Sequence, residues 1–201
     1  MKGKTLPILG LAAALSLASC DAVIIGGSVL AASNKRAEAE RYRADMEYKA
    51  RIDASRLARG ESIATVSFGN IDVNYNAVEQ GQRGIRLSPN FVIHNQRGRD
   101  TMLNVYFYHE NGESLLDRDG LFSTSNGKVA AGGEILTPSW GNASYTDRSV
   151  FLPSSQLDLG NPEGNPREYK LKCFVMLQDV NSGRPQTIGR SKWVYFNYKT
   201  K

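Results

Sequence analysis

The chain has 201 residues, of which 41% are hydrophobic and 22% charged, with two cysteines and a formal net charge of +5. This composition excludes a disordered tail, a disulfide-rich miniprotein and a multi-pass membrane protein, and the length suits one domain with a spacer. Residues 1–19 carry a charge of +2 and residues 34–59 carry +3, whereas residues 60–201 carry only +1. Because nucleic-acid-binding domains concentrate basic residues on one face, we expect no nucleic-acid partner.

Residues 1–19 are typical of a signal peptide. Two lysines precede an apolar run over residues 6–17, which is too short to cross a bilayer as a helix. The run ends in Leu-Ala-Ser-Cys at 17–20, which resembles the lipobox of bacterial lipoproteins. The resemblance implies cleavage before Cys20, acylation of Cys20 and attachment to the inner or outer membrane of a Gram-negative cell, facing the periplasm or the cell surface.

An uncleaved anchor is the alternative to lipidation. Such an anchor would continue to Leu30 and place Asp21 near the middle of the bilayer, at a cost of about 2.5–3.5 kcal/mol. Cleavage is therefore favoured, and residues 20–33 become the lipidated N-terminus and an apolar tether. The apolar residues 22–30 would lie against the membrane surface or pack in an oligomer. Lipidation of Cys20 would leave Cys173 without a partner for a disulfide.

Residues 34–60 predict a charged helical spacer. Residues 34–59 contain no glycine or proline, half of them are charged, and opposite charges recur four residues apart, which supports an isolated helix. Gly60 is a suitable C-terminal stop. The helix would be about 40 Å long, a stalk that lifts the following domain off the membrane. Pairing with a partner's coiled coil is the alternative.

Residues 61–201 predict an antiparallel β-sandwich. Fifteen glycines and six of the seven prolines fall in residues 60–201, between alternating runs rich in β-branched and aromatic residues. No convincing helix interrupts these runs, which favours a sandwich. The expected strands cover residues 63–68, 71–78, 85–95, 101–110, 129–137, 147–152, 168–179 and 187–199. The expected core comprises Phe91, Ile93, Val105, Phe107, Phe151, Phe174, Met176, Trp193 and Phe196.

Several motifs in this region resemble one domain family. They include Phe-Val-Ile-His-Asn at 91–95, Thr-Pro-Ser-Trp at 137–140 and Ser-Lys-Trp-Val-Tyr-Phe at 191–196. Further matches fall at residues 84–87, 105–108, 111–115, 151–153 and 157–159. Together they resemble an uncharacterised β-sandwich domain of Bacteroidetes-type bacteria. The resemblance implies an Ig-like sandwich and no activity.

Residues with reactive or metal-binding side chains are few. His94, His109 and Cys173 would make a Cys/His pair only if the fold joined them, and no third orienting group is apparent. The acidic run at 117–120 lacks the spacing of a calcium loop, and no zinc pattern or phosphate loop is present. We therefore expect no enzyme, no cofactor and no metal site.

Aromatic residues and one short motif suggest other roles. Exposed aromatics on one sheet would form a glycan platform, for which the candidates are Tyr106, Tyr108, Trp140, Tyr145, Tyr195 and Tyr198. Asp-Thr-Met at 100–102 resembles the short O-glycosylation motif of Bacteroidetes, with Thr101 as the acceptor.

The function expected from the sequence is that of a lipid-anchored cell-envelope protein. Cys20 would hold it to a membrane, and the β-sandwich would act as a protein-interaction or structural module, with another envelope protein as partner. The alternative is a surface lipoprotein that binds a glycan or another ligand.

Overall fold

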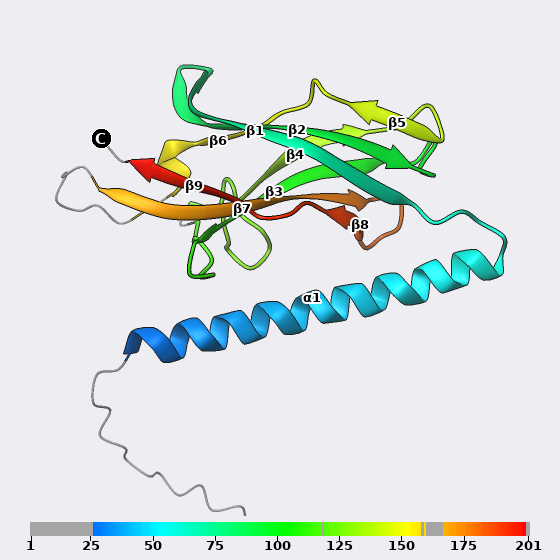
Figure 1. The fold of residues 1–201 in the computed structure, drawn as a ribbon, viewed down its shortest axis with the longest axis horizontal. Helices are drawn as coiled ribbons and strands as arrows, with labels where there is room; N and C mark the ends of the chain where they lie inside the picture. Colours follow the sequence, from blue (N-terminus) through cyan, green and yellow to red (C-terminus); the bar gives the residue numbers. More distant parts are fainter. Residues whose placement is uncertain (1–25, 118, 158, 160–166, 200–201) are drawn as a thin grey trace, which may run out of the picture.

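The computed structural model describes residues 26–117, 119–157, 159 and 167–199 (Figure 1). One long helix, α1 (Gly26–Ala58), precedes nine strands within these residues. The strands are β1 (Thr65–Glu79), β2 (Gln82–His94), β3 (Thr101–His109), β4 (Ala130–Leu136), β5 (Asn142–Tyr145), β6 (Val150–Pro153), β7 (Glu168–Asp179), β8 (Gln186–Arg190) and β9 (Val194–Lys199). A short 3-10 turn, Ser154–Leu157, follows β6.

The strands form two antiparallel sheets packed face to face, so the expected β-sandwich is confirmed (Figure 1). In the first sheet β1 pairs with β2, which pairs in turn with β5 and β6. In the second sheet β4, β3 and β7 are neighbours, and β8 and β9 both pair with β7. The described pairings are all antiparallel, which is the pattern of sheets whose strands are joined by hairpins and longer loops.

The observed strands depart from the expected ones in three places. The two strands expected over 63–68 and 71–78 are one long β1, which continues through two register shifts opposite β2. The strand expected over 187–199 is broken at residues 191–193 into β8 and β9. The break occurs because Ser191 binds the backbone of Val175 through both its N–H and its Oγ. The four-residue β5 was not expected, because it follows Gly141 within a turn-rich stretch.

The core lies between the two sheets and follows the period-2 alternation of the strands. Ile85, Leu87, Phe91 and Ile93 face it from β2, and alternate residues of β3 and β7 face it from the opposite sheet. The expected core residues Phe91, Ile93, Val105, Phe107 and Phe196 are confirmed.

Of the other four expected core residues, Phe174 is buried as expected, but on the outer face of the five-stranded sheet and outside the core between the sheets. Phe151, Met176 and Trp193 are only partly buried, and the prediction was wrong for them. Phe174 and Met176 occupy the alternate positions of β7, between the core residues Cys173, Val175 and Leu177. Leu152 takes the core position next to Phe151. Trp193 lies in the break between β8 and β9 and meets Phe174 edge-on. The direction of a side chain on a strand is set by the alternation of the pleat, and apolar residues at both alternations of β7 leave that direction open in the sequence.

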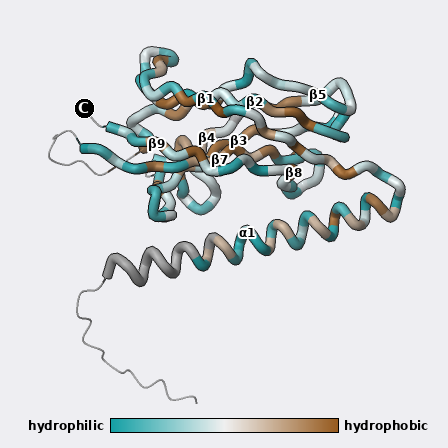
Figure 2. Tube along the Cα trace, viewed as in Figure 1, coloured by the Kyte–Doolittle hydropathy of each residue, from teal (hydrophilic) through white to brown (hydrophobic). Residues whose placement is uncertain are grey.

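Helix α1 confirms the expected charged helix and extends it to Gly26. It ends at Ala58, and Gly60 adopts a left-handed φ of 73°, as its role at the helix end requires. The expectation of a free-standing stalk is corrected, because α1 lies alongside the five-stranded sheet (Figure 1). Hydrophilic residues occur along the described part of the helix, consistent with a surface position (Figure 2). Among the described residues, no helix combines the length and apolar character needed to cross a membrane.

Candidate functional site

The lipidation candidate Cys20 lies outside the described residues, as does the signal peptide over residues 1–19. The structure therefore places neither of them. The other residues singled out in the sequence lie in the sandwich, where their positions can be compared.

The fold separates Cys173 from His94 but not from His109, which lies diagonally across from it on the neighbouring strand β3. Cys173 is fully buried in the core, and burial raises the pKa of its thiol to about 12. His94 ends β2 in the opposite sheet, where its ring lies 3.2 Å from Ser67 Oγ and 2.9 Å from Asn142 Oδ1. His109 ends β3 opposite Leu171, and burial lowers its pKa. The thiol is protonated at neutral pH and out of reach of solvent, so this set forms no nucleophilic site.

Two carboxylates of the acidic run at 117–120, those of Asp117 and Asp119, accept hydrogen bonds from the chain. Asp117 accepts the backbone N–H groups of Asp119 and Phe122 at 3.3 and 2.9 Å. Asp119 accepts a bond from Gln156 Nε2 at 2.8 Å, which is the main reason that its pKa is lowered. No group of three or more potential metal ligands occurs among the described residues.

The six aromatic residues expected to form a glycan platform are scattered. Trp140 is 70% exposed between β4 and β5, whereas Tyr145 stacks on Phe91 at the edge of the core. Tyr195 is exposed on β9, and Tyr198 packs against the core. Tyr106 and Tyr108 alone lie together, so these six residues do not make one sugar-binding face.

Thr101 lies at the start of β3 and is fully buried. A glycosyltransferase acting on the folded domain could not reach its hydroxyl, so the structure contradicts Thr101 as a glycan acceptor on the folded protein.

Tyr106 and Tyr108 belong instead to an outer aromatic cluster with Phe174 and Trp193, on the face of the five-stranded sheet that points away from the core. Phe174 stacks between the two tyrosine rings, with centroid distances of 5.2 and 5.8 Å. Trp193 meets Phe174 and Tyr108 edge-on at 5.0 and 5.4 Å. Such pairs contribute about 0.5–1.5 kcal/mol each beyond the area that they bury.

Two cations cover the rings of this cluster. The Arg190 guanidinium lies 3.9 Å from the centroid of Phe174 and 4.5 Å from that of Trp193. Lys172 Nζ lies 4.4 Å from the Trp193 centroid. A sugar stacks on an open ring face, and here cations occupy faces of Phe174 and Trp193.

Helix α1 is held to this face by arginine–aromatic contacts. Arg190 also lies 5.4 Å from the ring of Tyr42 on α1. Arg184, in the turn before β8, lies 4.7 Å from the Tyr48 ring and 3.7 Å from Asp45 Oδ1. Apolar side chains contribute little to the contact, because Tyr42 and Met46 are each more than 40% exposed.

A cavity of about 250 Å³ remains between α1 and the sheet. Arg41, Tyr42 and Asp45 line it from α1, and Lys128 lines it from the segment before β4. The sheet contributes the outer faces of β3, β7 and β8, namely Tyr106, Tyr108, Phe174, Met176, Gln178 and Arg190. This cavity combines aromatic rings with a majority of positive charges, and we take it as the candidate binding site.

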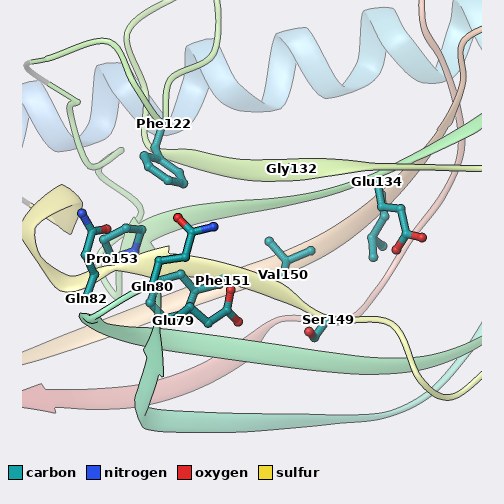
Figure 3. Close-up of a pocket in the computed structure, with 11 residues that line it drawn as sticks. Glu79, Gln80, Gln82, Phe122, Gly132, Glu134, Ser149, Val150, Phe151 and Pro153 are labelled. Carbon is teal, nitrogen blue, oxygen red and sulfur yellow. The ribbon is translucent and has the colours of Figure 1, made fainter.

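A second cavity, of about 290 Å³, opens between the sheets where β4 approaches β6 (Figure 3). Its carboxylates, Glu79 and Glu134, are neutralised by Arg86 and Arg148 respectively. The remaining lining is mainly amide and apolar and includes Gln80, Phe122 and Pro153. With both acids paired, this cavity offers no unbalanced charge to a ligand.

The sequence did not identify Arg190 as a site residue. Arg190, Trp193 and Phe174 come together only through the pairing of β8 with β7, which sequence spacing does not reveal. The one local signal was the short Gly-Arg-Ser-Lys-Trp stretch at 189–193, in which two cations flank the break between two strands.

Comparisons with known proteins give a weak structural similarity. No protein-family model matches the chain, and no curated protein matches it. The structure is similar to the solution structure of a protein described as a late embryogenesis abundant (LEA) protein, with 12% sequence identity and a TM-score of 0.37. The similarity covers 82% of this chain and 86% of that chain, and at this level it carries no argument about function.

Proposed function

We propose that this chain is a lipid-anchored protein of the bacterial cell envelope whose β-sandwich, of the Ig-like class, binds another protein. The signal peptide over residues 1–19 and the lipobox ending at Cys20 support the anchor. The two antiparallel sheets and the motifs shared with Bacteroidetes-type domains support the class of sandwich. Facing the periplasm or the cell surface, the domain would meet its partner in the envelope.

The cavity between α1 and the outer aromatic cluster carries the proposal of partner binding. Aromatic residues and arginine are enriched at protein interfaces, where buried rings and arginine forks supply most of the binding energy. Here both gather on a face that α1 covers only in part. The thiol of Cys173 is fully buried and burial raises its pKa to about 12, which supports binding rather than catalysis as the role of the domain.

The position of α1 relates this face to the anchor. Residues 21–25 alone lie between Cys20 and the first residue of α1, and the helix then lies along the sheet. A lipid on Cys20 would therefore hold the sandwich beside the membrane rather than a helix length above it.

Intact-mass analysis of the protein from its native membrane tests the anchor. The expected mass is that of a chain starting at Cys20 with added acyl groups. Cys20→Ala should remove the acyl mass and release the protein from the membrane, and Cys173→Ala is the matched control that should keep both. A mass that retains Met1 without acyl groups would refute the lipoprotein proposal.

Photo-crosslinking in whole cells tests partner binding. A photoreactive residue at Tyr42, beside the cavity, should yield a discrete adduct with another envelope protein. The same residue at Asn142, on the opposite sheet, is the control and should not yield that adduct. Absence of a specific adduct from Tyr42, with the protein folded and anchored, would contradict the proposed interaction role.

A further inference from the structure

Arg190 has an unusual environment for an arginine at the edge of a folded domain. Its guanidinium is surrounded by the rings of Phe174, Trp193 and Tyr42. Within the described part of the chain, it has neither a carboxylate partner nor another hydrogen-bond acceptor. A guanidinium that lies over ring faces can still donate hydrogen bonds through its N–H groups. The rings thus hold an arginine in place while its donors lack an anion.

The charges around the cavity favour an anion as well. Three of the four charged residues that line it are cations, namely Arg41, Lys128 and Arg190. The fourth is Asp45, whose charge is opposed by Arg184 from outside the lining at 3.7 Å. Because Arg41 and Arg190 line the cavity and Asp45 already has a cationic partner, the lining favours an anion, and arginine forks match the geometry of carboxylates.

We propose that Arg190 binds a carboxylate side chain from an acidic segment of the partner protein, inserted between α1 and the five-stranded sheet. An apolar neighbour in that segment would lie against Tyr106 and Met176, which line the same cavity. This inference rests on the proposed interaction role and adds the chemistry of the partner.

The shape of the cavity favours a peptide segment over other anions. Its volume of about 250 Å³ suits one or two side chains and lies below the range of about 300–1,000 Å³ that is typical of small-molecule sites. Arg41, Tyr42 and Asp45 border it from α1 and the outer face of the sheet borders it from the other side, so it is a half-open cleft between two elements. An extended peptide fits such a cleft better than a flat bilayer surface does.

The test uses the full-length protein with Trp140→Phe, which leaves Trp193 as the sole tryptophan of the chain. Because Trp193 contacts Arg190, its fluorescence should report an anion that binds there. The probe is a capped peptide with Glu-Phe-Glu between Gly-Ser flanks, and the matched control peptide has Gln-Phe-Gln. Inorganic phosphate and vesicles of phosphatidylglycerol in phosphatidylcholine are tested in parallel. Calorimetry gives the same affinities without relying on Trp193.

The Glu peptide should saturate the signal and bind about 10- to 100-fold more tightly than the Gln peptide, because the bonds to arginine are charge-assisted. Arg190→Gln should abolish this preference. Arg41→Gln should weaken binding several-fold, and it serves as the second variant because Arg41 is exposed and its loss leaves the fold intact. Arg36→Gln, an exposed arginine outside the cavity lining, is the matched control and should bind like the parent protein.

Equal binding of the two peptides would overturn the inference, as would binding that neither Arg190→Gln nor Arg41→Gln weakens. If phosphate binds as tightly as the Glu peptide, the cavity is a general anion site and not a site for an acidic peptide segment, and the inference is wrong. Vesicle binding without peptide binding would assign the face to lipid. A crosslinked envelope partner combined with failure of the peptide would refute this inference and leave the proposed function standing.

Discussion

Val66 of β1 packs directly over the backbone of Gly189 in β8, and this contact joins the two sheets of the sandwich. A Cβ atom at position 189 would overlap with Cγ1 of Val66. Val66 packs against the core, which limits its freedom to move aside. Glycine is therefore required at position 189 by close packing and not by a left-handed backbone.

We expect Gly189→Ala to lower the free energy of unfolding by about 1–3 kcal/mol, the usual effect of forcing an extra group into a packed site. Urea unfolding of the full-length protein measures this change. Gly183→Ala is the matched control, because a Cβ atom there meets open space in the turn before β8. That control should change the stability by less than about 0.5 kcal/mol. Equal losses from the two substitutions would show that Val66 is not the cause.

The fold class could be predicted from the sequence because alternation reports which side of a strand faces the core. Val105 and Phe107 alternate with Asn104, Tyr106 and Tyr108, which are more polar, and both are buried between the sheets. Phe174 shows the limit of this rule. Its neighbours on β7 are apolar on both sides, so the pattern does not give the direction, and its size suggested the core.

The candidate site could not be predicted because its parts meet only in three dimensions. Tyr42 and Arg190 are about 150 positions apart in the chain, and neither lies in a recognisable motif. The aromatic residues of the outer cluster were noted individually, but strand pairing alone shows that Tyr106 and Tyr108 flank Phe174. Cys20 is the opposite case, since a local motif predicts it and the described residues do not include it.

Cys173 should make the stability of the protein depend on pH in the alkaline range. Burial raises the pKa of its thiol from an ordinary value near 9 to about 12. The folded state therefore keeps the proton where the unfolded chain loses it, so the thiol's contribution to stability is complete below pH 9 and is lost between about pH 9 and 12. The loss approaches about 1.4 kcal/mol per pH unit.

This contribution is isolated by comparison with Cys173→Ala, because tyrosines and lysines titrate in the same range in both proteins. Unfolding free energies of the two proteins should converge as the pH rises from 9 to 11. Parallel pH profiles would contradict a buried thiol at position 173. Native Cys173 should also react with a thiol reagent far more slowly than the unfolded chain, since it is fully buried.

Asp179 should contribute stability that is lost in acid. Burial alone would raise the pKa of this carboxylate, but hydrogen bonds from the side chain and backbone N–H of Asn181 and from Arg99 lower it to about 2. The contribution is therefore present above about pH 4 and declines as the pH falls toward 2.

At pH 7 we expect Asp179→Asn to lower the free energy of unfolding by about 2 kcal/mol, and the difference from the parent protein should shrink toward pH 2. Denaturant unfolding at several pH values measures both effects. Asp147→Asn, at an exposed carboxylate beside Arg148, is the control and should change little at any pH. A difference at Asp179 that persists unchanged at pH 2 would assign the loss to packing instead of charge.

Arg184 should control the docking of α1 without affecting the sandwich. Its contacts with Asp45 and Tyr48 are among the few that join the helix to β8 and its turn, and both charged side chains are more than half exposed. Such surface contacts contribute about 1 kcal/mol or less, so Arg184→Ala should leave the unfolding free energy of the sandwich within about 0.5 kcal/mol of the parent value. Hydrogen exchange over residues 36–58 should nevertheless accelerate several-fold, and raised salt should produce part of the same effect in the parent protein.

Arg97→Ala, at an exposed arginine in the turn after β2, is the matched control and should leave the exchange of α1 unchanged. Exchange in α1 that does not respond to Arg184→Ala would mean that the helix is held by its remaining contacts, above all by Arg190 against Tyr42.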